Sequence, residues 1–174
     1  MFDSNLHFFL PAFMLIAICL ILFWKFARNA VKINVYSPSI EKITAYNRLK
    51  RITGYYWAIF ICFVFMVLIY SMAPDYYFIF LPIENFNHSI VNEMGLLTLQ
   101  ISLVWILIAQ LQIDKELYKY SRDIDSLSAM ELVNYSEKML LSGMLVLFIG
   151  VLITITNILS LILVMCGFYI YFKK

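Results

Sequence analysis

Long apolar segments constrain this chain more than any other feature of its sequence. Four of them cover about residues 8–27, 55–73, 90–113 and 139–172. A helix needs about 20 apolar residues to cross the roughly 30 Å hydrocarbon core of a bilayer. With 63% hydrophobic and 14% charged residues, the chain is also far from the composition of a soluble domain. The sequence therefore predicts an all-α integral membrane protein, with a single transmembrane helical domain over residues 1–174 that forms a four-helix bundle.

The distribution of Lys and Arg predicts the orientation of this bundle, because cationic residues of short loops are retained on the cytoplasmic side. Residues 28–51 carry six such cations against one acid, and residues 114–138 carry four more. The N-terminal residues before the first span and the connection over 73–89 carry none. We therefore expect the N-terminus to lie outside and both basic segments to lie in the cytoplasm. Basic loops that face inward suit a bacterial inner membrane.

The last apolar segment, 139–172, has an unusual length. As one helix its 34 residues would extend about 50 Å, whereas two crossings and a turn would need about 40 residues. We expect one overlong helix, whose far end docks on the aromatic outer connection. The alternative is a hairpin broken at the stretch "TITNILS", which would place the C-terminus inside instead of outside.

Helical periodicity continues beyond the third span. Apolar residues from Ile113 to Leu127 follow a spacing of four and three, which predicts about 13 more helical residues, or about 20 Å. Ser128 and Glu131 then have the form of a capping box, and Ser37 with Pro38 opens an earlier helix. Helices 2–4 should thus extend into the cytoplasm over about 38–54 and 114–138, the latter as a helical hairpin. The charged residues expected to form a docking surface there are Lys42, Arg48, Lys50, Arg51, Asp123 and Asp125.

Small and polar residues form a stripe in the last apolar segment. Such stripes let helices approach closely in lipid. The predicted interface consists of Gly143, Gly150, Thr154, Asn157, Ser160 and Gly167. Packing within one protomer and packing between protomers are both open for this stripe. Gln100 and Asn157 are further predicted to form a polar contact inside the membrane, because a polar side chain in hydrocarbon needs a partner.

The sequence carries none of the usual motifs for zinc, nucleotide or nucleophilic chemistry. It therefore assigns no catalytic, cofactor-binding or metal residue, and it names no cofactor. The expected function is that of a noncatalytic oligomerising membrane subunit, docked to itself or to a larger membrane complex through the last helix and the cytoplasmic helical stalk. The expected partners are membrane lipid and other protein subunits, not nucleic acid. The alternatives are a small intramembrane enzyme or lipid/quinone-binding protein, and a passive oligomeric channel.

Overall fold

The computed structural model is all-helical over the residues that it describes, which are 4–29, 40–83, 88–122 and 126–172. It describes side chains for residues 8–22, 52–83, 88–112 and 138–172. Its elements in chain order are α1 (Ser4–Asn29), α2 (Ile40–Met72), the 3-10 helix η1 (Pro74–Phe80), α3 (Ser89–Arg122), α4 (Ser126–Ile155) and α5 (Ile158–Phe172).

Three helices are long and apolar enough to cross a membrane. Their apolar segments are Ile52–Met72 in α2, Ser89–Gln112 in α3 and Lys138–Ile155 in α4. The described apolar parts of α1 and α5, Phe8–Leu22 and Ile158–Phe172, are shorter. The predicted all-α integral membrane protein is confirmed to this extent.

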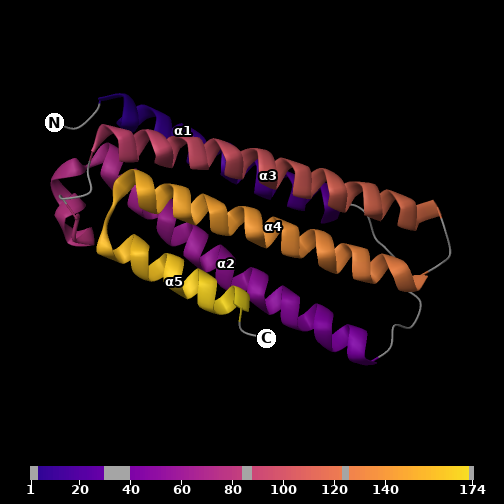
Figure 1. Cartoon of the computed structure of the whole chain (residues 1–174). Helices are drawn as coiled ribbons and strands as arrows, with labels where there is room; N and C mark the ends of the chain where they lie inside the picture. Colours follow the sequence, from indigo (N-terminus) through magenta and orange to yellow (C-terminus); the bar gives the residue numbers. More distant parts are fainter. Residues whose placement is uncertain (1–3, 30–39, 84–87, 123–125, 173–174) are drawn as a thin grey trace.

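The long helices lie side by side, with η1 across one end of the bundle (Figure 1). α3 and α4 form an antiparallel hairpin whose connection lies at the opposite end from η1 (Figure 1). α5 turns back from the η1 end and lies beside α4 and α2, so the chain ends partway along the bundle (Figure 1).

The predicted single helix over residues 139–172 is wrong. α4 ends at Ile155 and α5 begins at Ile158, so this segment is a hairpin, which was the alternative. The 15 residues of α5 extend about 22 Å, less than the hydrocarbon thickness. The physical reason for the break is a set of hydrogen bonds that fastens residues 155–158 to the connection between α2 and α3, which contains η1.

Helix continues beyond the apolar segments on both sides of the α3–α4 connection. α3 runs to Arg122, and α4 begins at Ser126, two residues before the predicted cap at Ser128. The second helix begins at Ile40, and Ser37 and Pro38 lie outside the described residues. The period of four and three residues thus predicted that helix continues to Arg122, but Leu127, the last residue of the predicted stripe, belongs to α4 and not to α3.

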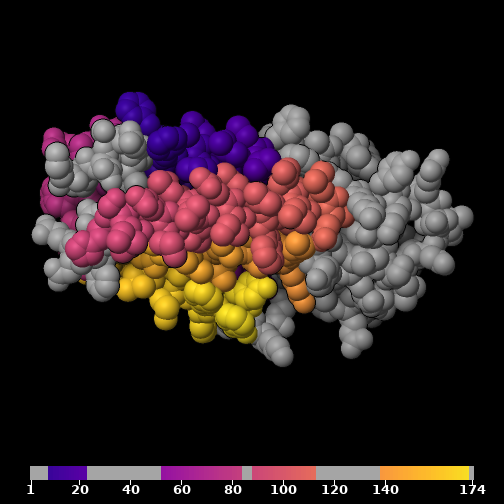
Figure 2. Space-filling model, turned by 45° about the horizontal axis from the view of Figure 1, so that its top comes forward, coloured from indigo at the N-terminus to yellow at the C-terminus, as the bar shows by residue number. Residues whose placement is uncertain are grey.

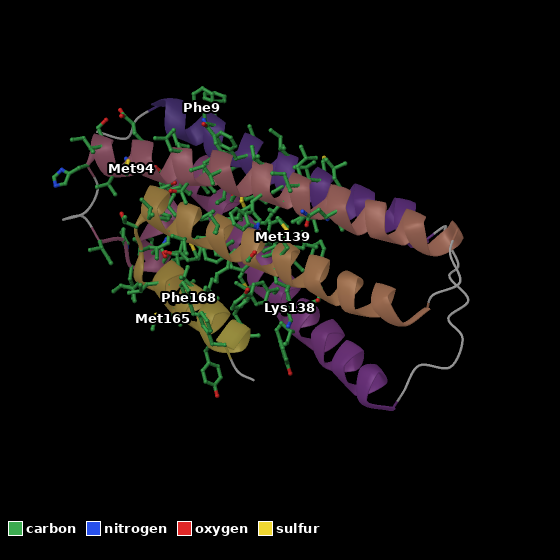
Figure 3. The ribbon with its side chains drawn as sticks, turned by 45° about the vertical axis from the view of Figure 1, so that its right-hand side comes forward. Phe9, Met94, Lys138, Met139, Met165 and Phe168 are labelled. Carbon is green, nitrogen blue, oxygen red and sulfur yellow. The ribbon has the colours of Figure 1, made fainter. Side chains whose placement is uncertain are left out.

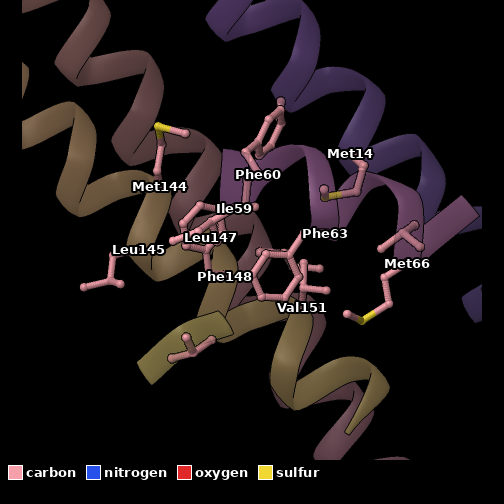
Figure 4. Packing of buried hydrophobic residues seen from close by; sticks show 14 of the residues in the cluster. Met14, Ile59, Phe60, Phe63, Met66, Met144, Leu145, Leu147, Phe148 and Val151 are labelled. Carbon is pink, nitrogen blue, oxygen red and sulfur yellow. The ribbon is translucent and has the colours of Figure 1, made fainter. Parts of the chain in front are cut away.

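Aromatic side chains fill the interior where α2 meets α4. The rings of Phe63 and Phe148 (Figure 4) are stacked with centroids 5.0 Å apart. The ring of Tyr56 approaches that of Phe148 at 5.8 Å. Apolar side chains also cover the outer surface, for example Phe9 on α1, Met94 on α3 and Met165 on α5 (Figure 3). Because lipid tails are as apolar as these side chains, the helices associate through close packing and polar contacts and not through exclusion of water.

Candidate functional site

The turn between α4 and α5 holds the densest polar network among the described residues. Asn157 is completely buried and precedes α5, and its Oδ1 accepts a hydrogen bond of 2.6 Å from the backbone N–H of Ser160. This is N-cap geometry, which satisfies a donor that the first turn of a helix leaves without a partner. The Ser160 hydroxyl in turn donates to the Asn157 carbonyl at 2.9 Å. Asn157 therefore starts a new helix where the sequence offers neither Gly nor Pro.

The amide nitrogen of Asn157 joins the turn to α2 and to η1. Its Nδ2 donates to the Tyr77 hydroxyl at 2.8 Å and to the Met66 sulfur at 3.1 Å. The Tyr77 hydroxyl in turn donates to the carbonyl of Ile155, the last residue of α4. A buried helix end leaves carbonyls that water cannot reach, and Tyr77 supplies the donor that one of them needs.

Backbone hydrogen bonds complete the attachment of the α4–α5 turn to the connection between α2 and α3, which contains η1. The Ile83 N–H donates to the Thr156 carbonyl at 3.0 Å, and the Ile158 N–H donates to the Leu81 carbonyl at 3.1 Å. Leu81 has a φ of 55°, which is a left-handed conformation that residues other than Gly seldom adopt. The connection that contains η1 therefore holds the α4–α5 turn in place at the cost of local backbone strain. The sequence predicted that the far end of one overlong helix docks on this connection, but the α4–α5 turn docks there instead.

Burial also fixes the protonation state of Tyr77. Desolvation raises the pKa of the Tyr77 phenol to about 12, against a smaller opposing effect of the hydrogen bond from Asn157. The neutral phenol both accepts from Asn157 and donates to Ile155. The network therefore keeps its hydrogen bonds throughout the neutral pH range.

α3 and α4 approach each other closely at Gly95. A Cβ atom added there would lie 2.7 Å from the backbone nitrogen of Thr154 and 2.9 Å from its Cα, and would also overlap Oγ1. The Thr154 hydroxyl donates to the Gly150 carbonyl of its own helix at 2.7 Å. Gly95 therefore lets two backbones touch, as small residues do between membrane helices.

The predicted small and polar stripe lies inside the chain. Gly143 faces Ile106 and Trp105, and Gly150 faces Leu99; a Cβ atom added at either glycine would lie 3.0 Å from the nearest side-chain carbon. On α5, the Gly167 carbonyl accepts a hydrogen bond of 2.9 Å from the Tyr56 hydroxyl, which holds α5 to α2. These are contacts within one chain. All six residues of the stripe, Gly143, Gly150, Thr154, Asn157, Ser160 and Gly167, are buried.

The structure does not bring Gln100 and Asn157 together. The side-chain amide of Asn157 forms hydrogen bonds with Tyr77, Met66 and Ser160, whereas Gln100 is exposed on α3. The predicted docking surface is only partly traced. The backbones of Lys42, Arg48, Lys50 and Arg51 belong to α2, but their side chains, together with the whole of Asp123 and Asp125, lie outside the described residues.

Metal-binding chemistry has no support in the described part of the chain. No group of three or more His, Cys, Asp or Glu side chains there is arranged to hold a metal ion. Cys19, Cys62 and Cys166 form no disulfide and lie exposed on separate helices. The described site is therefore a structural polar network and a set of helix contacts.

Sequence reasoning missed Gly95, Tyr77 and Tyr56. Gly95 is a lone glycine in an apolar span, which is itself a signal of close helix approach. The two tyrosines carry no comparable signal, because twelve tyrosines are spread over the chain and only tertiary packing selects these two as donors to helix carbonyls. Comparisons with protein-family models, curated proteins and solved structures each found no match.

Proposed function

We propose that this protein is a noncatalytic membrane subunit that docks to copies of itself or to a larger membrane complex through the helical stalk formed by α3 and α4. One observation supports this proposal above the others, namely that both helices continue where the sequence is no longer apolar. α3 runs on to Arg122 and α4 begins at Ser126, whereas the sequence from Asp114 to Lys138 is rich in charged residues. These parts extend roughly 15–18 Å beyond the spans.

A paired helical projection suits a docking role for a physical reason. The two helices pack against each other within the bundle, and their helical backbones continue to Arg122 and from Ser126. A preordered surface loses less conformational entropy on binding than a floppy loop does. The stalk rather than the small residues of α4 is the proposed docking element, because those small residues are occupied inside the chain.

We also propose that α1 crosses the membrane, so that the chain has four crossings with its N-terminus outside. α1 has 26 residues, or about 39 Å of helix, and lies along α2 and α3 (Figure 1). The basic segments over 28–51 and 114–138 would then share the cytoplasmic side, with η1 outside. This orientation suits a bacterial inner membrane.

The experiment that tests the docking role measures the size and composition of the purified protein in mild detergent. We expect an oligomer, or a complex with another membrane protein. The double substitution Asp123→Lys and Asp125→Lys reverses two charges in the sequence between α3 and α4 and should reduce that assembly. Asp75→Lys is the matched control, because Asp75 is exposed at the opposite end of the bundle. A wild-type protein that is monomeric and carries no other protein would overturn the proposal.

A second candidate function, lipid or quinone binding, is supported by the surface of η1. Tyr76, Phe78 and Ile79 point outward with 60–68% of their surfaces exposed, next to the exposed Leu81. Such an aromatic surface suits the headgroup region of a bilayer, where Tyr and Trp are enriched. Retention of one lipid or quinone species through purification, and its loss in a Tyr76→Ala, Phe78→Ala variant, would favour this function.

A further inference from the structure

We propose that two copies of this protein pair through the exposed face of α3, with Gln100 of each copy bonded to the same residue of the other. This inference rests on the proposed function, since it names a contact through which a subunit of this kind would assemble. It concerns the membrane-embedded face of α3 and not the stalk. The residues of this face, which we call the α3 seam, are Leu97, Gln100, Val104, Leu107 and Leu111.

Gln100 is exposed at the middle of a membrane span. The apolar segment of α3 runs from Ser89 to Gln112, so Gln100 lies about halfway along it. Its side chain is too short to reach either headgroup region, each about 15 Å away. Among the described residues it forms no hydrogen bond. A carboxamide that faces hydrocarbon at this depth is unfavourable, because lipid tails cannot replace the hydrogen bonds that water would make.

The other polar side chains in the middle of α3 are satisfied within the chain. Thr98 donates to the Met94 carbonyl at 2.8 Å, and Ser102 donates to the Leu99 carbonyl at 2.7 Å. Trp105 donates its indole N–H to the Ser142 hydroxyl at 3.2 Å. Gln100 is thus the exception among the polar side chains in the middle of this span, which points to a partner outside the chain.

The geometry of the α3 seam suits another helix. Its residues follow a spacing of three, four, three and four, which is the heptad spacing of helices that cross at about 20°. Leu97, Val104 and Leu111 are 52–57% exposed. Figure 2 shows this face of α3 uncovered between α1 and the α4–α5 hairpin. The seam therefore offers apolar side chains on both sides of one central amide.

A second copy is the partner that these observations favour. All copies in one membrane share an orientation, so a residue at a given depth meets the same residue across a two-fold axis. A carboxamide has both donors and an acceptor, so two Gln100 side chains can satisfy each other reciprocally. Lipid tails offer no such partner. A single polar residue at the core position of a heptad seam also fixes the register of the pair.

The test measures self-association of the full-length protein in lipid vesicles by energy transfer between separately labelled copies, at decreasing protein-to-lipid ratios. Gln100→Leu should weaken association by about threefold to thirtyfold, from the strength of interhelical hydrogen bonds in membranes. Gln100→Asn retains the amide and should keep most of the association. Thr98→Val is the matched control, because the Thr98 hydroxyl bonds within its own helix.

Disulfide cross-linking tests where the two copies touch, and it does not depend on how strongly they associate. In a background with Cys19, Cys62 and Cys166 replaced by Ala, Val104→Cys should form a disulfide-linked dimer. Phe65→Cys, which places a thiol on the exposed face of α2, should not. Disulfide formation requires Cα atoms within about 7 Å, so it reports direct contact between the two α3 helices.

The outcomes separate this inference from the proposed function. An assembly that is unaffected by Gln100→Leu and gives no cross-link at Val104→Cys would overturn the α3 contact while leaving the docking role intact. A Val104→Cys cross-link to a different protein would also overturn it, because the partner would not be a second copy. Wild-type protein that fails to self-associate at any ratio overturns the inference, and the proposed function falls with it if no other protein co-purifies.

Discussion

Gly95→Ala tests the contact between α3 and α4 by adding a single methyl group. The new Cβ would lie 2.7 Å from the Thr154 backbone nitrogen and 2.9 Å from its Cα, whereas ordinary contacts are 3.4–4 Å. Backbone atoms cannot rotate out of the way, so the two helices must separate locally. Overpacking of this kind costs about 1–3 kcal/mol.

Gly54→Ala is the matched control for this substitution. An added Cβ at Gly54, on α2, meets nothing within 4 Å. Both variants gain the same helix propensity, up to about 1 kcal/mol, so this contribution cancels in the comparison. We therefore expect Gly54→Ala to be neutral or slightly stabilising, and Gly95→Ala to be less stable than Gly54→Ala by about 1–3 kcal/mol.

The assay is reversible unfolding in mixed micelles, driven by increasing SDS and followed by circular dichroism and by tryptophan fluorescence. Trp105 is a suitable reporter because it bonds to Ser142 across the α3–α4 contact. Adding Thr154→Ala to Gly95→Ala should restore little stability, since the closest backbone atoms remain. Equal stability of the two glycine variants, within about 0.5 kcal/mol, would show that α3 and α4 do not touch at Gly95.

Three further predictions concern the end of the bundle at η1, and α5. Asn157→Ala removes a helix cap and two buried donor contacts, so the free energy of unfolding in the same assay should fall by about 2–4 kcal/mol. If the losses of stability in Asn157→Ala and Tyr77→Phe simply add in the double variant, the direct hydrogen bond between the two side chains is contradicted. Because burial raises the pKa of Tyr77 to about 12 from its usual 10.0, the folded state holds this proton more tightly. The contribution of Tyr77 to the free energy of unfolding should then be constant below pH 10 and fall as the pH rises from 10 towards 12. If the wild type and Tyr77→Phe show the same dependence of stability on pH, this prediction is refuted. Tyr56→Phe removes the hydrogen bond to the Gly167 carbonyl, so it should lower the stability by about 1 kcal/mol and increase the hydrogen exchange of backbone amides in α5. Unchanged exchange in α5 would mean that this bond does not hold α5 to α2.

Local sequence pattern predicted the helices and their membrane character well. Only helices and closed barrels satisfy their backbone groups in lipid, and continuous apolar segments of about 20 residues indicate helices because barrel strands are only about 10 residues long. The continuation of α3 to Arg122 followed from apolar residues at a spacing of four and three, and the restart at Ser126 lay close to the predicted cap. Both signals act within a few residues along the chain, so they do not depend on the rest of the fold.

Predictions that required knowledge of neighbours were less successful. Residues 139–172 have the composition of one continuous helix, and nothing local distinguishes Asn157 from other polar residues of the segment. The break after Ile155 occurs because Tyr77, Leu81 and Ile83 supply hydrogen-bonding partners from a segment more than 70 residues away. Sequence alone could not predict that those groups would lie there.

The order of residues was thus enough to establish a helical membrane protein and to place helix beyond the third span and ahead of the fourth. It was not enough to tell which polar side chains find partners within the chain. Asn157 and Gln100 are both carboxamides in apolar surroundings, yet one is buried in a complete network and the other faces outward. The difference arises because helix periodicity fixes only which residues share a face, whereas the packing of neighbouring helices determines whether that face is covered.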